Sequence, residues 1–389
     1  MHGRSSIHCI IPPHMLREIV ENGTLEQRQQ ALRNIVSAEA LRMQREVISK
    51  EGPEETIMEA ATAGGLNRVV YTANNLSNLP GRAIRTEGAS PCGIPAADEA
   101  YDGAGNTYAL FSDIYKRDSI DSNGMRIDST VQFRTGYDNA FWNGRQMVYG
   151  DGDEDLPVNQ RLFNRFTIAL DIIAHELAHG VTQFTANLVY QGQSGAINES
   201  MSDVFGSLVK QRMLGQTASE ADWIVGEGLF TPNVNGFGIR SMKEPGTAYN
   251  DPVLGRDPQP GHMRDYVQTQ SDNGGVHINS GIPNRAFYVT ATNIGEHAWE
   301  KAGQIWYVTL NSKLQARSDF ATTAAKTYEA ARDLFGQGSL EQQAVRAGWA
   351  EVGIEVESGS TPPTSGGDER PGCVPSLAGL VRSLVGPRS

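Results

Sequence analysis

The alternation of apolar and polar positions divides the chain into stretches of different predicted structure. Residues 24–50 are mostly charged or polar, with apolar positions near helical spacing, which predicts a helix that Gly52 and Pro53 end. From about residue 66 to 156, short β-rich runs alternate with turn clusters rich in Gly, Asn and Asp. The runs that we predict as strands are residues 68–71, 108–111 and 146–149.

Longer helical patterns take over from about residue 158 to 351. The clearest of them are residues 163–185, 196–213 and 320–335. A β-rich part followed by a helical part is typical of an α+β fold. Residues 357–389 begin with a run rich in Ser, Gly, Thr and Pro, which predicts a flexible tail.

Composition narrows the class of protein. The 389 residues suffice for a large core and two or three domains. A net charge of -12 argues against a nucleic-acid groove, which needs a basic surface, and no apolar run approaches the ~20 residues of a membrane-spanning helix. The three scattered cysteines, Cys9, Cys92 and Cys373, do not form a disulfide framework. The first residues lack the apolar core of a secretory signal, so intracellular use and export by another route both stay open.

A metal-binding pattern lies inside the helix predicted at residues 163–185. His175 and His179 are four residues apart, so on a helix they share a face and point at one ion. Glu176 lies beside them, placed to take a proton from an attacking water. The same spacing also occurs by chance on ordinary helices, so the motif predicts a zinc site only with further ligands.

A third ligand is offered by the next helical run. A catalytic zinc needs three protein ligands and one open position. Glu199 lies at the start of that run, and Asp203 follows four residues later on the same face. A carboxylate in that position can accept the second N–H of a metal-bound histidine and fix its orientation.

Together these two motifs resemble the signature of the thermolysin family of zinc proteases, at the spacing that this family uses. The likeness covers about residues 66–355. It implies one catalytic Zn²⁺ bound by His175, His179 and Glu199, with Glu176 as the general base.

The same resemblance assigns the groups around the metal. Asp203 and Asn198 support the histidine ligands. Peptide hydrolysis builds negative charge on the carbonyl oxygen, which needs donors besides the metal. In the segment that begins at Asp272, His277 matches one such donor, oriented by Asp272, and Tyr190 matches the other.

Substrate-binding residues follow by resemblance as well. Asn139 and the Ala140 backbone match the edge strand along which the family binds an extended peptide. Arg240 matches the arginine that holds the carbonyl of the residue after the scissile bond. Four apolar residues match the pocket for that residue: Phe163, Phe166, Ile172 and Ile239. We therefore expect cleavage before hydrophobic residues.

The calcium positions depart from the family pattern. Asp171, Asp222 and Glu227 match three carboxylates of the double calcium site of long-precursor members, but Lys210 and Ile224 fill the other two positions. Because Ca²⁺ requires oxygen ligands, we expect fewer Ca²⁺ ions than in thermolysin, with the Lys210 ammonium pairing with Asp171 or Asp222.

The N-terminal segment resembles the short prosegment of the protealysin branch, which has a Pro-Pro motif near its start, here Pro12 and Pro13. By that resemblance residues 1–55 are an inhibitory prosegment removed by self-cleavage. Cys9 has two readings: its thiolate plugs the open zinc position, or it is a small buried apolar residue.

These inferences predict a two-lobed, thermolysin-like α+β fold with the active cleft between the lobes. Its parts are a prosegment at 1–55, a β-rich lobe at 56–157, a helical lobe at 158–356 and a tail at 357–389. The predicted function is that of a zinc-dependent neutral endopeptidase, a self-processing zymogen that acts on peptides or proteins and is inhibited by its own prosegment.

Two rival functions remain. An aminopeptidase could use the same histidine pair, but it would need an acidic site for a free amine, and none stands out. A non-enzymatic interaction protein would be expected to have lost Glu176, Glu199 or His277, and all three are present.

Overall fold

The computed structural model describes residues 8–51 and 65–356, with side chains described for 9–38 and 65–356. Three expectations fall outside these residues: the helix stop at Gly52 and Pro53, the end of the prosegment near residue 55, and the tail with Cys373. Among the helices of the described part, none has the length and apolarity needed to cross a membrane.

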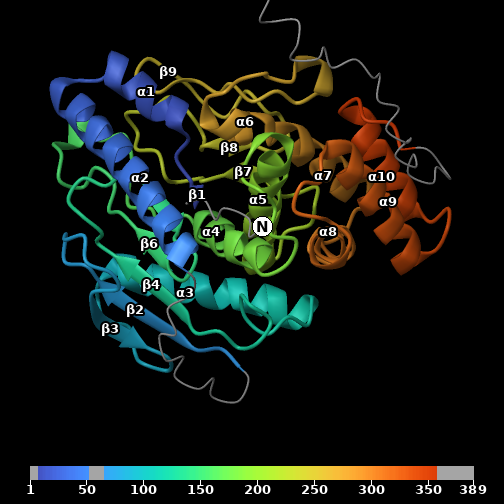
Figure 1. Ribbon diagram of the computed structural model, residues 1–389, viewed down its shortest axis with the longest axis horizontal. Helices are drawn as coiled ribbons and strands as arrows, with labels where there is room; N and C mark the ends of the chain where they lie inside the picture. The colour runs from blue at the N-terminus through green and yellow to red at the C-terminus, as the bar shows by residue number, and fades with distance from the viewer. Residues whose placement is uncertain (1–7, 52–64, 357–389) are drawn as a thin grey trace, which may run out of the picture. The chain divides into compact units, whose positions relative to one another are not determined.

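A six-stranded sheet contains all the longer strands of the described part, in the order β1-β5-β6-β4-β2-β3 (Figure 1). Strands β2, β4 and β6 run parallel to one another, and the other neighbours are antiparallel. The strands are β1 His8–Cys9, β2 Arg68–Thr72, β3 Arg82–Thr86, β4 Ile127–Val131, β5 Ala140–Trp142 and β6 Met147–Tyr149. Strand β1 comes from the N-terminal segment and covers the edge of β5, so without it β5 would be an edge strand.

The N-terminal segment continues as a pair of helices, α1 (Pro13–Asn22) and α2 (Leu25–Glu51), drawn in blue in Figure 1. The predicted helix at 24–50 therefore forms. Pro13 occupies the first turn of α1, where a missing N–H costs nothing. This proline start turns the chain out of the extended conformation of β1 and into a helix.

One predicted strand is wrong. Residues 108–111 end helix α3 (Pro95–Ala109) and begin a π-helical turn, Leu110–Ile114. The buried Phe111 ring packs on Phe205, with centroids 5.1 Å apart. Periodicity does not distinguish a short apolar strand from a buried helix segment. Here contact with the helical core favours the helix. Helix α3 packs against β2 and β4 of the sheet.

The second half of the described chain is mainly helical. Its helices are α4 Leu170–Gln183, α5 Gly192–Leu214, α6 Asp272–Asn279, α7 Gly281–Ile294, α8 Lys301–Ser312, α9 Phe320–Phe335 and α10 Leu340–Glu351. The prediction for α9 is confirmed. Helix α4 begins later than predicted because Phe163 instead forms a β-bridge with Phe230. Helix α5 begins earlier, so Glu199 lies well inside it rather than at its start.

Short elements complete this half. Strand β7 (Ile224–Val225) pairs with β8 (Arg240–Ser241), and β9 (Asn250–Asp251) pairs with β10 (Gly255–Arg256). The 3-10 turns are Val158–Gln160 and Met263–Asp265. The β7–β8 pair holds Arg240 beside the helices that carry the metal-binding motif.

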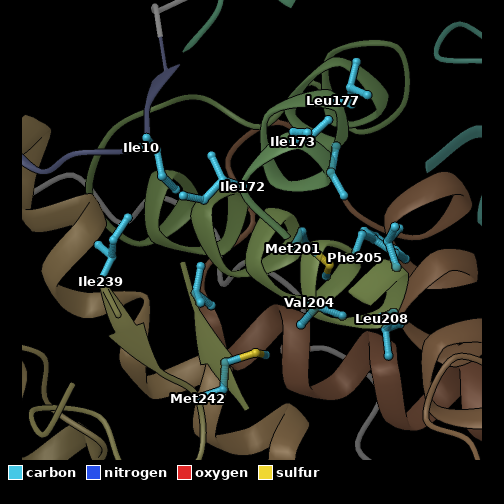
Figure 2. Close-up of a cluster of buried hydrophobic side chains, with 14 of the residues drawn as sticks. Ile10, Ile172, Ile173, Leu177, Met201, Val204, Phe205, Leu208, Ile239 and Met242 are labelled. Carbon is cyan, nitrogen blue, oxygen red and sulfur yellow. The ribbon is translucent and has the colours of Figure 1, made fainter. Parts of the chain in front are cut away.

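Helices α4 and α5 are held together by a buried apolar cluster (Figure 2). Its members come from α4, from α5, from the β8 region and from the N-terminal segment: Ile172, Ile173, Leu177, Met201, Val204, Phe205, Leu208, Ile239, Met242 and Ile10. Burial of each large aliphatic side chain stabilises a fold by about 1.5–3 kcal/mol. The cluster therefore fixes the relative position of the two helices that carry the metal-binding motif.

Candidate metal centre and cleft

Helices α4 and α5 bring three ligand groups together. His175, His179 and Glu199 are all buried, and one ligand atom from each lies within 4.8 Å of the others. The two imidazole Nε2 atoms are 3.1 Å apart, and Glu199 carboxylate oxygens lie 3.6 Å from His175 Nε2 and 3.3 Å from His179 Nε2. Two histidines and one carboxylate are a donor set typical of catalytic zinc.

The chemistry of these groups fits a cation. Glu199 Oε2 is buried without a hydrogen-bond partner, an arrangement that is costly unless a cation compensates it. Burial alone would raise the pKa of Glu199, but the imidazoles of His277 and His179 lower it well below its usual range. Burial lowers the pKa of His175 to about 4, against the raising effect of Asp203. The carboxylate is thus charged and the imidazole neutral, as ligation requires.

Neighbouring side chains hold both imidazoles in place. His175 Nδ1 lies 2.8 Å from Asp203 Oδ1. His179 Nδ1 lies 2.8 Å from Asn198 Oδ1 and 3.0 Å from Ser202 Oγ. Such contacts set which ring nitrogen faces the metal. Ser202 was missed at the sequence level, although it lies inside the motif that ends at Asp203.

Asp203 also binds the cleft arginine. Arg240 donates to both Asp203 oxygens, each at 2.8 Å, and Asn284 Nδ2 donates to Oδ2 at 2.8 Å. Burial would raise the pKa of Asp203, but Arg240 and His175 lower it to about 2. Asn284 was not predicted, because its position on α7 has no recognisable spacing to the motif.

Glu176 faces the same centre from α4. It is fully buried, and its Oε2 accepts the Trp142 N–H at 2.9 Å, while Oε1 has no hydrogen-bond partner. Burial, followed by the charge of Glu199, raises the pKa of Glu176 well above its usual range. A carboxylate with a raised pKa is a stronger base, which suits proton transfer near neutral pH.

His277 and Tyr190, the two predicted donors, lie next to Glu199. His277 Nδ1 is 2.6 Å from Asp272 Oδ1, and Tyr190 Oη is 3.2 Å from His277 Nε2. Burial opposes protonation of His277, but Asp272 and Glu199 raise its pKa to about 9. Tyr190 Oη also donates to Glu199 Oε1.

The backbone of α6 explains how Asp272 reaches His277. Residues 272–275 all have positive φ, and Gly274 and Gly275 adopt this conformation without a steric penalty. The resulting turn brings the Asp272 carboxylate back over the helix, where Oδ2 accepts the His277 N–H at 2.9 Å.

The N-terminal segment contacts several of the predicted active-site and substrate-binding groups. The Cys9 carbonyl accepts from His277 Nε2 at 3.0 Å. The Ile10 N–H donates to the Ala140 carbonyl at 3.2 Å, and Arg240 Nη1 donates to the Ile10 carbonyl at 3.4 Å. The predicted substrate-binding groups are therefore engaged by the chain itself.

One residue further along, the Ile11 N–H donates to Asn139 Oδ1 at 3.0 Å. The Ile10 side chain is completely buried and points toward Ile172, with Ile239 nearby (Figure 2). Phe163 and Phe166 are buried in the same core and pack on each other, with ring centroids 6.0 Å apart.

Cys9 contributes its backbone to this arrangement. The residue belongs to a second apolar cluster, with Ala38, Ala73, Phe133, Tyr137, Phe141 and Val148. The converging ligand atoms come from His175, His179 and Glu199 among the described residues. The contact with His277 is made by the Cys9 carbonyl, and the thiol plug stays a prediction.

Lys210 lies among the three carboxylates at the predicted calcium positions. Lys210 Nζ lies 2.7 Å from Asp222 Oδ2, 2.8 Å from Glu227 Oε2 and 3.9 Å from Asp171 Oδ2. It also donates to the Ile224 carbonyl at 3.4 Å. Burial, only partly offset by the Lys210 charge, raises the pKa of Asp171 to about 6. The ammonium lies among all three carboxylates, including Glu227, whose pairing we had not predicted.

Comparison with known proteins gives one family. Residues 70–183 match the thermolysin metallopeptidase catalytic domain, and residues 186–354 match the thermolysin metallopeptidase alpha-helical domain. An extracellular metalloprotease of Pectobacterium carotovorum is 48% identical over 90% of this chain and 97% of its own length. Protease PrtS of a Photorhabdus species is 44% identical over 90% of this chain and 92% of its own.

A solved structure is similar as well. The precursor of protealysin, a metalloproteinase from Serratia proteamaculans, is 49% identical, with a TM-score of 0.79. The match covers 89% of this chain and 99% of that one.

Proposed function

The chain belongs to the thermolysin family of zinc metallopeptidases, and we propose that it is a self-processing zymogen that cleaves peptide bonds on the N-terminal side of hydrophobic residues. The observation that carries this proposal is the N-terminal segment, whose Cys9 carbonyl binds His277 and whose Ile10 side chain is completely buried. Residues 1–55 are then the inhibitory prosegment, and residues 56–157 and 158–356 form the two lobes of the catalytic unit.

His175, His179 and Glu199 would hold the zinc, which when bound supplies a Lewis acid for the peptide carbonyl and the attacking water. Glu176 takes the proton of that water through its unpartnered Oε1. Oxygen then bonds to the carbonyl carbon, the carbon–nitrogen bond breaks, and Glu176 returns the proton to the leaving nitrogen. Water is consumed, and a carboxylate and an amine are formed.

Negative charge develops on the carbonyl oxygen during this step. His277, whose pKa of about 9 keeps it protonated at neutral pH, donates to that oxygen from one side. The Tyr190 hydroxyl, 3.2 Å from His277 Nε2, is the second donor. Donors fixed in advance in a buried site cost no reorganisation when the charge forms.

Substrate backbone is held by Asn139, Ala140 and Arg240, the groups that the prosegment uses in the precursor. Ile172 and Ile239, with Phe163 and Phe166 in the same core, give the pocket its apolar wall. A charged side chain would lose its hydration there without a partner. Hydrophobic residues after the scissile bond are therefore favoured.

The test uses the processed enzyme and internally quenched peptides blocked at both ends. Peptides with Leu or Phe after the central bond should be cleaved, a peptide with Asp there should not, and a zinc chelator should abolish cleavage. Cleavage only of peptides with a free amino terminus would indicate an aminopeptidase. Equal cleavage of the Asp peptide would contradict the proposed specificity.

A further inference from the structure

Asp138 and Asp153 form a buried pair of carboxyl groups just before strand β5. Asp138 is 4% exposed and Asp153 is 2% exposed. Burial raises the pKa of both groups, and the neighbouring negative charge of Asp155 raises it further. Among the residues with described side chains, neither carboxylate forms an ion pair with a basic group. The pair is therefore an electronegative site whose charge is not balanced.

Two carboxamide side chains of α2 cover this pair. Gln30 Nε2 donates to both Asp138 oxygens and to Asp153 Oδ1, at 2.7–3.1 Å, and Asn34 Nδ2 donates to Asp138 Oδ2 at 3.0 Å. Gln30 is 1% exposed, and its own Oε1 is buried without a hydrogen-bond partner in the described structure. Because the site offers acceptors only, a group that has donors only, such as an ammonium or a guanidinium, would match it better than a carboxamide.

The pair lies next to the edge along which an extended peptide is expected to bind. Asp138 directly precedes Asn139, the predicted substrate-binding residue, in the chain. Strand β1 runs antiparallel to β5. A peptide bound to the same edge in this direction approaches Asn139 and then Asp138 as it runs toward its carboxyl end. It advances by about 3.3 Å per residue, so a side chain shortly after the scissile bond comes within reach of the pair.

We propose that removal of the N-terminal segment uncovers Asp138 and Asp153 as a subsite for a basic side chain of the substrate, Lys or Arg, on the C-terminal side of the scissile bond. This inference rests on the proposed function and extends it. The basic group takes the place of the Gln30 and Asn34 amides. In the precursor α2 fills the subsite, so the preference belongs to the processed enzyme alone.

Space for a long side chain lies beside the pair. A cavity of about 420 Å³ separates α2 from residues 134–137, and Asn34 lines it as well as binding Asp138. Departure of α2 opens this cavity and the two carboxylates together. A Lys or Arg side chain can then lay its methylene groups along the cavity wall while its charged end reaches the carboxylates.

The two carboxylates have different parts in the subsite. Asp153 Oδ2 accepts the backbone N–H groups of Leu162 and Phe163, at 2.6 and 2.9 Å, so Asp153 also holds the chain that leads to the apolar pocket. Asp138 instead accepts from α2 through both of its oxygens. Asp138 is therefore the residue whose substitution tests the subsite with the least effect on the fold.

The experiment uses the processed enzyme and internally quenched peptides blocked at both ends, with Leu after the central bond. Lys or Glu is placed two, three or four residues after that bond. At low ionic strength the kcat/KM of the Lys peptide should exceed that of the Glu peptide by about tenfold at one of these positions, since the pair attracts one charge and repels the other. The ratio should approach one in about 1 M salt, where charges are screened within about 3 Å.

Matched variants assign the preference to the pair. Asp138→Asn keeps the shape of the side chain and should bring the ratio of Lys to Glu cleavage close to one, whereas Asp138→Glu should retain a preference for Lys. Asp102→Asn removes the same charge from an exposed position on α3 and should leave the ratio unchanged. Because the readout is a ratio, a lower yield of folded enzyme does not affect it. A Lys preference that survives in Asp138→Asn would overturn the inference.

The peptide series also separates this inference from the proposed function. Cleavage of the Lys and Glu peptides at equal rates, at all three positions and at low ionic strength, would overturn the subsite alone. A preference that does not fall with salt would also overturn it, because it could not come from charge. Failure to cleave any peptide of the series would instead contradict the proposed function.

Discussion

The Asp203 carboxylate joins a predicted metal ligand, His175, to Arg240, which we propose binds substrate. It lies 2.8 Å from His175 Nδ1 and accepts two hydrogen bonds from Arg240, all in a buried setting. Its low pKa keeps it charged at any pH at which the enzyme would work. A single side chain thus holds both a histidine of the predicted metal site and the arginine that we propose binds substrate.

Replacing this charge tests that dual role. Asp203→Asn should weaken zinc affinity by roughly tenfold to hundredfold, because the residues that orient metal ligands typically contribute that much, and should also raise KM through Arg240. Zinc affinity is measured by competition with a chelator. Asn284→Ala, which removes a bond to the same carboxylate but leaves its charge, should have a smaller effect; an equal effect would assign the role to packing.

We propose that the Lys210 ammonium takes the place of a calcium ion that carboxylates alone would bind. Its ammonium lies within 3.9 Å of three acidic side chains. Lys210→Glu should convert this cluster to a calcium site, since four acidic groups then converge without a counter-charge. The melting temperature of the variant should rise with added calcium, while that of the wild type stays unchanged. Stabilisation of the wild type to the same extent would show that the lysine does not replace calcium.

One substitution distinguishes the two roles considered for Cys9, a thiolate that plugs the zinc position and a small buried apolar residue. Its carbonyl, rather than its side chain, makes the contact with His277. Cys9→Ser keeps that carbonyl, so the unprocessed chain should remain as latent as the wild type in an assay of peptide cleavage at time zero. Loss of latency in this variant would instead support a thiol that plugs the zinc position.

At the scale of elements, α2 seals two buried carboxyl groups. Gln30 and Asn34 cover Asp138, whose neighbour Asp153 also accepts from Gln30. Burial, followed by the charge of Asp153, raises the pKa of Asp138 well above its usual range. Burial also raises the pKa of Asp153 to about 6, although backbone N–H groups lower it in part.

This burial predicts that docking of α2 depends on pH. The docked form has the higher carboxyl pKa and so holds more protons than the released form, whose carboxyls titrate near their ordinary value of ~3.9. Docking is therefore fully favoured at low pH and weakens as pH rises through about 6. The equilibrium constant for docking of α2 changes by at most about tenfold per pH unit for each proton released.

Amide hydrogen exchange of α2 measures this dependence, in the Glu176→Ala chain between about pH 5 and pH 8, after correction for intrinsic exchange rates. Protection should fall as pH rises. Asp138→Asn removes one of the two coupled charges and should flatten the dependence. Protection that is constant with pH in the parent chain would show that α2 does not sense these carboxyls.

Contacts between elements could be predicted from the sequence where they follow from helix geometry. His175 and His179 converge because residues four apart on α4 share a face, and Asp203 reaches His175 because α5 packs on α4. The strand assigned to residues 108–111 was wrong because tertiary contact, not periodicity, determines the secondary structure of a short apolar run. The pairing of β1 with β5 could not be predicted from local pattern, because β1 is only two residues long.

At the scale of the whole molecule, the N-terminal segment that we propose to be a prosegment contacts groups of the proposed catalytic unit. Cys9 and Ile10 contact His277, Ala140 of β5 and Arg240, the groups that we propose bind a substrate. The sequence contained the resemblance to a short prosegment, but not these contacts, which depend on where α1 and α2 anchor. Under the proposed function, latency and substrate choice come from a single set of contacts, and activation requires their release.

The central claim is that this chain activates itself through Glu176. Its most direct test is the intact mass of the zinc-loaded full chain over time, beside that of Glu176→Ala. We predict that the wild type alone loses its N-terminal segment and then cleaves a blocked peptide with Leu after the central bond. If both chains shorten equally, or if the wild type neither shortens nor cleaves the peptide, the account is contradicted.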